Sequence, residues 1–401
     1  MIDLEDAQGL VLESCAPLAP VVADHREVVG CVLAADVVAT EDVPPFDNTA
    51  VDGYAVRSAD LATVPVELAV IGEVAAGAPP FAGVLRAGQT VRVMTGAPMP
   101  DGADAAAMVE DSERVGDERV RLDRVVEAGA AVRRAGDDVR SGDVVFAAGT
   151  VVTPAVLGVL ASINARRVEV FPRARVAVLS TGDELVTDGG PLRPGQIRES
   201  NATMLAPALR AAGCVVTELG VVGDDEATLS AVLRGAVDGH DAIVTSGGVS
   251  MGDYDVVKAV LGQIAEMHWM QIAIKPAKPF AFGTIDGVPV FGLPGNPVSS
   301  LVSFELLARP ALRRMMGHQR LARPSVVAVV DEPIERRADG KVHLVRVNGA
   351  FLDDGRYHVR PVGAQGSHQL AATATATALA VVPDGTGVPA GAEVAVLVLT
   401  T

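Results

Sequence analysis

The pattern of hydrophobic and polar positions changes twice along the 401-residue chain. Before Pro172, short apolar runs containing β-branched valines alternate with Gly, Pro and Asp, as in Val91–Met94 and Arg119–Leu122. This pattern is typical of short strands joined by tight turns. One helix is expected over Pro154–Ile163, because Thr153 is a good N-cap and proline suits the first helical position.

From Pro172 onward, predicted strands alternate with predicted helices. The strands expected here are Arg175–Leu179, Val215–Val222, Ala242–Thr245 and Gly287–Leu293. The helices are Ser200–Ala212 with Ser200 or Asn201 as cap, Asp225–Val237, one around Val256–Leu261, and Val298–Leu307. Such alternation implies a parallel, doubly wound sheet, whose ligands bind beyond the carboxyl ends of the strands.

After Arg323-Pro324 the chain returns to short strands, which suggests a small all-β barrel or sandwich. The strands expected are Ser325–Val330, Val342–Asn348, Tyr357–Pro361, Ala378–Val382 and Glu393–Leu399. The chain is therefore expected to be an α/β multidomain protein. Its divisions are a β-rich region over 1–172, an α/β domain over 173–322 and a β-domain over 323–401.

Composition narrows the function classes. The net charge of −17 repels nucleic acid and anionic membranes, so an anionic substrate needs a locally basic pocket. Three dispersed cysteines with no CxxC pair fit a reducing compartment. The acidic N-terminus does not resemble a signal peptide, and the weakly polar stretch Gln369–Val382 is too short for a membrane span. We expect a soluble cytoplasmic protein.

Only four of the 33 basic residues are lysines, and two of these lie three apart in AIKPAKPFAFG. Pro276 and Pro279 stiffen the segment, so a loop that presents the Lys275 and Lys278 ammonium groups to a phosphate or oxyanion is one interpretation. Chance retention in an arginine-biased chain is the other, although it does not explain why the two are paired.

Polar, Gly-rich turns follow the predicted strands. STGDEL comes after Arg175–Leu179, and SGGVSMGDYD comes after Ala242–Thr245. Glycines at a strand-to-helix turn let backbone N–H groups approach a phosphate. The alternative is that Gly182, Gly247 and Gly248 only form tight turns.

Four acids are expected at the same edge of the sheet, namely Glu184, Asp224, Asp253 and Asp255. Carboxylates placed there suit Mg²⁺ that bridges to a phosphate. Asp224 and Asp253 could instead be helix N-caps.

The N-terminal region contains PPFDNTAVDGYAV, VMTGAPMPDGADA and VRRAGDDVRSGD, and the Asp-Asn and Asp-Gly pairs in the first of these are ordinary turn chemistry. The seven histidines are scattered, so no Ser/His/Asp or Cys/His nucleophile is proposed; His368 in QGSHQL is a lone candidate.

Taken together, these segments resemble the MoeA family, the molybdopterin molybdenumtransferases, whose eukaryotic relatives include the C-terminal part of gephyrin. The resemblance covers nearly the whole chain in eight collinear segments: PPFDNTAVDGYAVR, VRVMTGAPMPDGADA, RRAGDDVRSGD, VAVLSTGDEL, GQIRESN, TSGGVSMGDYD, AIKPAKPFAFG and FGLPGNPVSSLVSFE.

The resemblance implies that molybdate is inserted into adenylyl-molybdopterin and that AMP is released, with Mg²⁺ as cofactor. It implies two interleaved N-terminal domains, a MogA-like α/β domain and a C-terminal β-barrel. It also implies a homodimer whose active-site cleft both subunits line, and possible contact with a MogA-like adenylyltransferase.

Site residues follow by motif position. The implied catalytic residues are Asp52, Thr95, Asp138, Glu184, Asp224, Asp255 and Lys275, of which Glu184, Asp224 and Asp255 would hold the metal. The implied substrate-binding residues are Arg133, Ser246, Gly247, Gly248, Lys278, Pro294, Gly295, Asn296 and Ser367.

Two departures and two alternatives stand beside this interpretation. Ala277 replaces the glycine of the usual KPGKP, and Gln271 stands where some relatives have another lysine. One alternative is a molybdopterin adenylyltransferase, although SGGVSMGDYD is not the TGGTG-type loop associated with that activity. The other is a non-catalytic, gephyrin-like scaffold, which would have no physical need for this polar set.

Overall fold

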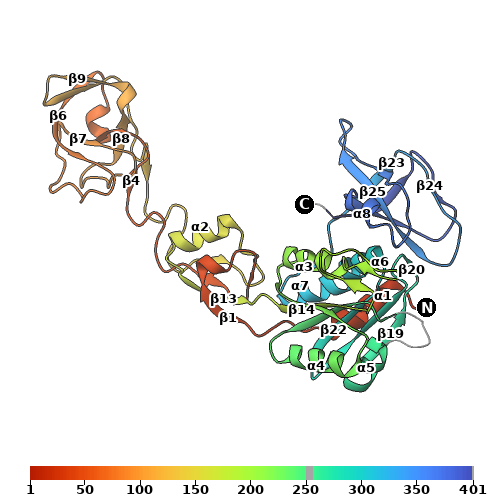
Figure 1. Cartoon of the computed structure of the whole chain (residues 1–401). Coiled ribbons are helices and arrows are strands. Elements are labelled where there is room, and N and C mark those ends of the chain that lie inside the picture. The colour runs from red at the N-terminus through yellow and green to blue at the C-terminus, as the bar shows by residue number, and fades with distance from the viewer. Residues whose placement is uncertain (250–255, 400–401) are drawn as a thin grey trace. The chain divides into compact units, whose positions relative to one another are not determined.

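The computed structural model describes residues 1–249 and 256–399, and the chain forms two compact units (Figure 1). One unit comprises Val22–Val29 and Ala35–Val168, and the other comprises Met1–Val21, Gly30–Ala34 and Glu169–Thr401. Within the described residues, no helix combines the length and the apolar character needed to cross a membrane.

The Ala35–Val168 unit is β-rich, as the sequence predicts. Its six-stranded sheet has the order β8-β5-β7-β6-β10-β9. The strands are β5 Gly53–Val56, β6 Val66–Val74, β7 Gln89–Val93, β8 Ala105–Met108, β9 Ser112–Val115 and β10 Arg119–Leu122. Two short pairs accompany this sheet: β3 (Val37–Val38) with β12 (Val144–Phe146), and β4 (Asn48–Thr49) with β11 (Val132–Arg133).

The helix of this unit begins where the sequence predicts. Helix α2 spans Pro154–Ser162, and the Thr153 hydroxyl accepts a hydrogen bond from the Val156 N–H at 3.2 Å. This bond satisfies one of the N–H groups that the first turn of a helix leaves without a partner.

The other unit contains the α/β domain, built on a six-stranded sheet of order β17-β14-β18-β22-β21-β19. Its strands are β14 Arg175–Thr181, β17 Val215–Val222, β18 Ala242–Ser246, β19 Glu266–Gln271, β21 Pro279–Ile285 and β22 Val288–Leu293. Its helices are α1 Leu4–Glu13, α3 Asn201–Ala211, α4 Glu226–Val237, α5 Val256–Ile264, α6 Pro297–Ser303 and α7 Arg309–Met315.

Helices cover both faces of this sheet (Figure 1). Strand residues Val176 and Val178 pack against α1, α3, α6 and α7 on one face, whereas Ala177 and Leu179 pack against α4 and α5 on the other. The alternation along β14 follows from the two-residue period of a strand. The predicted doubly wound architecture is therefore confirmed.

The sheet is not parallel throughout, contrary to the sequence-based expectation. Strands β17, β14, β18 and β22 are parallel, but β21 is antiparallel to β22 and β19 is antiparallel to β21. Asp286 and Gly287 join β21 to β22 with φ values of 49° and 83°. Asp-Gly with both φ angles positive is the preferred two-residue hairpin turn, so this signal in the sequence was missed.

The C-terminal domain is a closed five-stranded barrel. Strands β25, β26, β23, β29 and β27 pair in that order, and β27 pairs back onto β25. Their bounds are β23 Ser325–Val330, β25 Val342–Phe351, β26 Tyr357–Pro361, β27 Ala378–Val382 and β29 Glu393–Val398. Strand β20 (Ile274–Lys275) adds to β25, beside the start of that strand.

A buried histidine near the end of α7 predicts acid sensitivity. His318 is 9% exposed, and its burial, together with Arg313 and Arg309, lowers its pKa to about 4. In the unfolded chain this histidine binds a proton below pH 6.5, whereas in the folded protein it binds one only below about pH 4. Between these two values the unfolded state binds more protons, so the stability of the fold decreases as the pH falls. The full difference is about 3 kcal/mol.

His318→Gln should remove this contribution, so urea titrations from pH 7.5 to 4.5 should show a smaller loss of unfolding free energy than in the wild type. His358→Gln is the matched control. Hydrogen bonds to Asp331 and Asp354 raise the pKa of His358, so that histidine stabilises the fold at low pH and loses this effect as pH rises through its folded value. Equal pH slopes for His318→Gln and the wild type would contradict the prediction.

Candidate functional site

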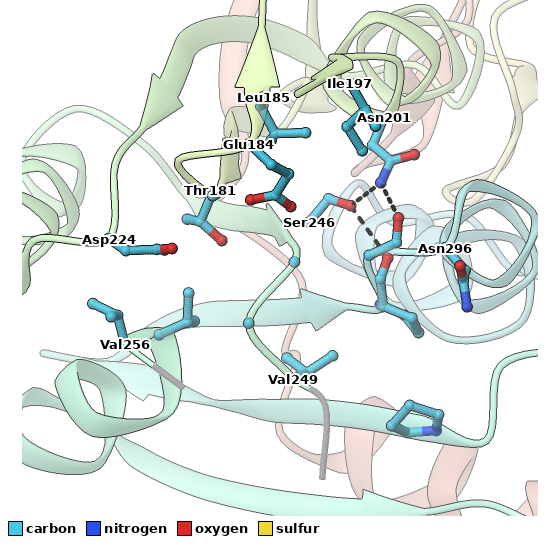
Figure 2. A pocket seen from close by; sticks show the side chains of 17 residues that line it. Thr181, Glu184, Leu185, Ile197, Asn201, Asp224, Ser246, Val249, Val256 and Asn296 are labelled. Atoms are coloured by element: carbon cyan, nitrogen blue, oxygen red, sulfur yellow. Dashed lines mark hydrogen bonds between the residues drawn. The ribbon is translucent and has the colours of Figure 1, made fainter. Parts of the chain in front are cut away.

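A cavity of about 590 Å³ lies at the carboxyl ends of β14, β18 and β22. This is the edge at which parallel α/β sheets bind ligands. Figure 2 shows the side chains that line it. The cavity is lined by Thr181, Gly182, Glu184, Leu185, Ile197, Asn201, Asp224, Ser246, Gly247, Gly248, Val249, Val256, Val257, Pro279, Pro294, Gly295 and Asn296.

Asp224 is not the cap of α4. The cap is Asp225, whose carboxylate accepts the Thr228 N–H at 2.8 Å. This interaction lowers the pKa of Asp225. The Asp224 carboxylate instead lines the cavity, and its backbone N–H donates to the Asp183 carboxylate at 3.0 Å. The capping alternative for Asp224 therefore fails.

Glu184 lines the same cavity from the turn after β14 (Figure 2). Its carboxylate folds over Gly182, where an added Cβ would clash with the Glu184 carboxylate oxygens. Among the described residues, no hydrogen bond or ion pair is formed by the carboxylate of Glu184 or Asp224. Within the part of the chain that the structure describes, both carboxylates are thus available to a ligand.

Gly182 and Gly247 of the Gly-rich turns allow close packing of backbone segments, and their N–H groups are not available as donors to a ligand. The Gly182 N–H donates to Val222 O at 3.2 Å, and the Gly247 N–H donates to Leu293 O at 3.1 Å. Gly247 has a φ of 103°, and a Cβ there would meet the Thr181 oxygens at 2.8 Å. The tight-turn alternative therefore accounts for these two glycines, whose N–H groups are already used.

Asn201 joins two of the turns and was considered from the sequence only as a helix cap. Its amide nitrogen donates to the Ser246 hydroxyl at 2.8 Å and to Gly295 O at 2.7 Å (Figure 2). The capping carboxylate of α3 comes from Glu199, which accepts the Ala202 N–H at 2.7 Å. Asn201 thereby holds Ser246 against the Pro294–Asn296 turn.

Lys275, the first of the paired lysines, lines a second cavity of about 710 Å³, which is formed by β20 and the barrel. Lys275 lines this cavity from β20, not from a loop as expected, whereas Lys278 follows in the connection to β21. Both side chains are exposed, and neither has a carboxylate partner in the part of the chain that is described. Ala277 between them has a φ of 77°, a conformation that favours glycine.

Arg346 was missed by the sequence analysis. It is fully buried in β25, and burial lowers its pKa. Its Nη2 donates to Ala364 O at 2.8 Å and to Gly366 O at 3.3 Å. Its Nε and Nη1 have no partner among the described residues, and no carboxylate neutralises it. An arginine within the apolar run Leu344–Val347 was the available signal, because a buried charge requires a partner.

Ser367 lies in the turn that Arg346 contacts. Its carbonyl accepts the Val298 N–H at 3.1 Å, at the start of α6. Because Pro294, Gly295 and Asn296 lead into α6, this bond connects the barrel turn to the wall of the first cavity. Asp255, the third implied metal ligand, and Asp253 lie outside the described residues.

Four implied site residues belong to the β-rich unit. The Asp52 carboxylate accepts the Thr95 N–H at 2.7 Å and the Thr95 hydroxyl at 2.8 Å, and these bonds lower the pKa of Asp52. Arg133 pairs with Asn48 across β11 and β4. The Asp138 N–H donates to Val43 O at 2.9 Å, and the Asp138 side chain is exposed.

The described residues are compatible with Mg²⁺ only as a substrate-bridging ion. They contain no cluster of three or more His, Cys, Asp or Glu side chains able to hold a metal. Mg²⁺, however, is usually bound by one or two carboxylates together with substrate phosphates and water. Glu184 and Asp224, with their free carboxylates in one cavity, fit that arrangement.

Three family profiles match successive parts of the chain. Residues 2–164 match the MoeA N-terminal region (domain I and II), residues 177–314 match a probable molybdopterin binding domain, and residues 334–399 match the MoeA C-terminal region (domain IV).

Proteins similar along the full length give the same result. The chain is 40% identical to molybdopterin molybdenumtransferase 2 of Mycobacterium tuberculosis, over 100% of both chains. It is 37% identical to the molybdopterin molybdenumtransferase of Haemophilus influenzae, over 93% of this chain and 92% of that one. A crystal structure of the molybdopterin biosynthesis MoeA protein from Pyrococcus horikoshii superposes with a TM-score of 0.82 at 32% identity, over 100% of both chains. The chain therefore belongs to the molybdopterin molybdenumtransferase (MoeA) family, as the sequence motifs indicate, and is an enzyme of molybdenum cofactor biosynthesis.

Proposed function

We propose that the protein is a molybdenum insertase that transfers molybdate into adenylyl-molybdopterin and releases AMP. The observation that carries this proposal is the pair of free carboxylates, Glu184 and Asp224, in a cavity at the ligand-binding edge of the sheet. The Ser367–Val298 hydrogen bond connects the wall of that cavity to a turn held by the Arg346 guanidinium, which has no carboxylate partner among the described residues.

The two carboxylates and the phosphates of the substrate would together hold Mg²⁺, which when bound supplies positive charge to the phosphoanhydride oxygens. Asp183 fixes the backbone at Asp224, and Asn201 fixes Ser246 against Gly295, so these residues orient the cavity walls before the substrate binds. Positioning and electrostatic stabilisation then suffice for phosphoryl chemistry, without a covalent intermediate.

Lys275, Lys278, Arg346 and Ser367 would receive the oxyanion. An acidic protein of charge −17 repels molybdate at long range, so cations without carboxylate partners are required at the point of capture. Asp52, Thr95, Arg133 and Asp138 are proposed to face the pterin or the oxyanion. A cytoplasmic homodimer whose cleft both subunits line, and contact with a MogA-like adenylyltransferase, remain parts of the proposal.

The reaction can be tested with purified protein, Mg²⁺, molybdate and adenylyl-molybdopterin. AMP measured by chromatography should appear in equal amounts with molybdenum cofactor measured by activation of a molybdenum-free apoenzyme. A parallel incubation with Mg-ATP and molybdopterin but no molybdate should yield no adenylyl-molybdopterin. Its accumulation would favour the adenylyltransferase alternative, and inactivity in both assays would favour the scaffold.

A further inference from the structure

The edge of β25 that faces away from β27 has a gap in its strand pairing. Residues Val342 and His343 pair with β20, and pairing with β26 begins only at Val347. Because β27 occupies the other edge over His343–Val347, β20 and β26 must share the first edge. Residues 344–346 therefore have no strand beside them on that edge.

The side chain of Gln365 fills this gap. Its Oε1 accepts the Arg346 N–H at 3.0 Å, and its Nε2 donates to Arg346 O at 3.0 Å and to Val362 O at 2.7 Å. One amide group thus reproduces the donor and acceptor that a neighbouring strand would offer. Since carbonyl oxygens can only accept, the Nε2 assignment of this amide is determined by its contacts.

The gap begins next to Lys275 and ends at Arg346. Lys275 of β20 pairs with His343, just before the gap, and Arg346 is the last residue of the gap. Lys275, Gln365 and Gly366 all line the cavity of about 710 Å³. The Arg346 guanidinium contacts the carbonyls of the same turn and retains two unpartnered donor atoms.

We propose that Gln365 is a positioning residue that sets the spacing between the Lys275 ammonium and the Arg346 guanidinium for binding of a tetrahedral oxyanion. This inference rests on the proposed function, because it names the residue that organises the oxyanion site of that reaction. Gln365 itself need not touch the anion. Without the Gln365 amide, the Arg346 N–H has no acceptor among the described residues on this edge, and the Arg346 carbonyl keeps only its bond from the Val362 N–H at 3.0 Å.

Gln365→Met has nearly the same length but makes none of these hydrogen bonds. We expect the KM for molybdate in the insertion assay to rise about tenfold while kcat at saturating molybdate stays within about twofold, because a free-energy difference near 1.4 kcal/mol falls on oxyanion binding. Gln365→Glu retains an acceptor for the Arg346 N–H but cannot donate to the Arg346 and Val362 carbonyls, and its negative charge should raise KM further. Urea unfolding of both variants verifies that each is folded at the assay temperature. Gln8→Met, which removes a hydrogen bond to Leu306 O in the same unit, should leave KM unchanged.

Arg346→Met tests the oxyanion site separately from the positioning role of Gln365. Tungstate binding, measured by calorimetry, is a readout that does not depend on turnover. Weakened binding in Arg346→Met and in both Gln365 variants supports the inference. Weakened binding in Arg346→Met with wild-type KM and tungstate affinity in both Gln365 variants overturns the role of Gln365 alone. Wild-type affinity in Arg346→Met overturns the oxyanion site and the inference together.

Discussion

Asp224→Ala should lower molybdenum insertion by about 100-fold or more while leaving the free energy of unfolding unchanged. The expected loss is that of a group which stabilises charge in the transition state. Stability should be preserved because the Asp224 carboxylate accepts no hydrogen bond from the described residues and lies exposed at the cavity. The measurement combines the single-turnover rate of AMP release with urea unfolding.

The adjacent Asp225 supplies a matched control. Its carboxylate caps α4 through the Thr228 N–H, so Asp225→Ala should cost about 1 kcal/mol of stability with little change in insertion. The two neighbouring carboxylates should therefore show opposite effects. Normal insertion in Asp224→Ala, or a comparable activity loss in Asp225→Ala, would show that the cavity carboxylate has been assigned incorrectly.

Lys275→Glu should lower kcat/KM for molybdate by about 100-fold, whereas Lys275→Ala should lower it only about tenfold. Truncation removes one donor and one positive charge, but reversal also repels the oxyanion. The effect of reversal should weaken at high salt, since Lys275 is exposed and exposed charges are screened. Initial rates at varied molybdate, in 50 mM and 500 mM salt, provide the measurement.

Lys258→Glu is the control for charge reversal in the same unit. Lys258 lies on α5, with its ammonium 5.7 Å from the centre of the Trp269 ring, and it lines neither cavity. Lys258→Glu and Lys275→Glu change the net charge of the protein by the same amount, so any effect of net charge alone should be equal in both variants. Equal losses in Lys258→Glu and Lys275→Glu would contradict a local oxyanion site at Lys275.

Elements with strong local signals were predictable from the sequence. The Val215–Val222 strand, the cap at Thr153 and the C-terminal strands Tyr357–Pro361 and Ala378–Val382 are found where periodicity and capping place them. The antiparallel edge of the sheet was not predicted, because Asp286-Gly287 was not recognised as a hairpin turn. Strands β19 and β21 were also not predicted, because each strand was expected to be followed by a helix.

The site was predictable only in part, for a physical reason. Glu184 and Asp224 follow separate strands, and the parallel sheet brings their turns together by a general rule of topology. The roles of Arg346, Asn201 and Gln365 depend instead on side-chain hydrogen bonds between segments far apart in the chain. No local pattern in the sequence determines those contacts, although an arginine inside an apolar strand indicates a buried charge that needs a partner.

Crystals soaked with AMP, Mg²⁺ and molybdate test the central claim most directly, with the molybdenum located by anomalous scattering. The account predicts an AMP phosphate in the cavity beside Glu184 and Asp224, with Mg²⁺ between them. It also predicts a molybdenum peak in contact with Lys275 or Arg346. A well-occupied molybdenum site that touches neither cation, or an AMP phosphate bound away from both carboxylates, would contradict it.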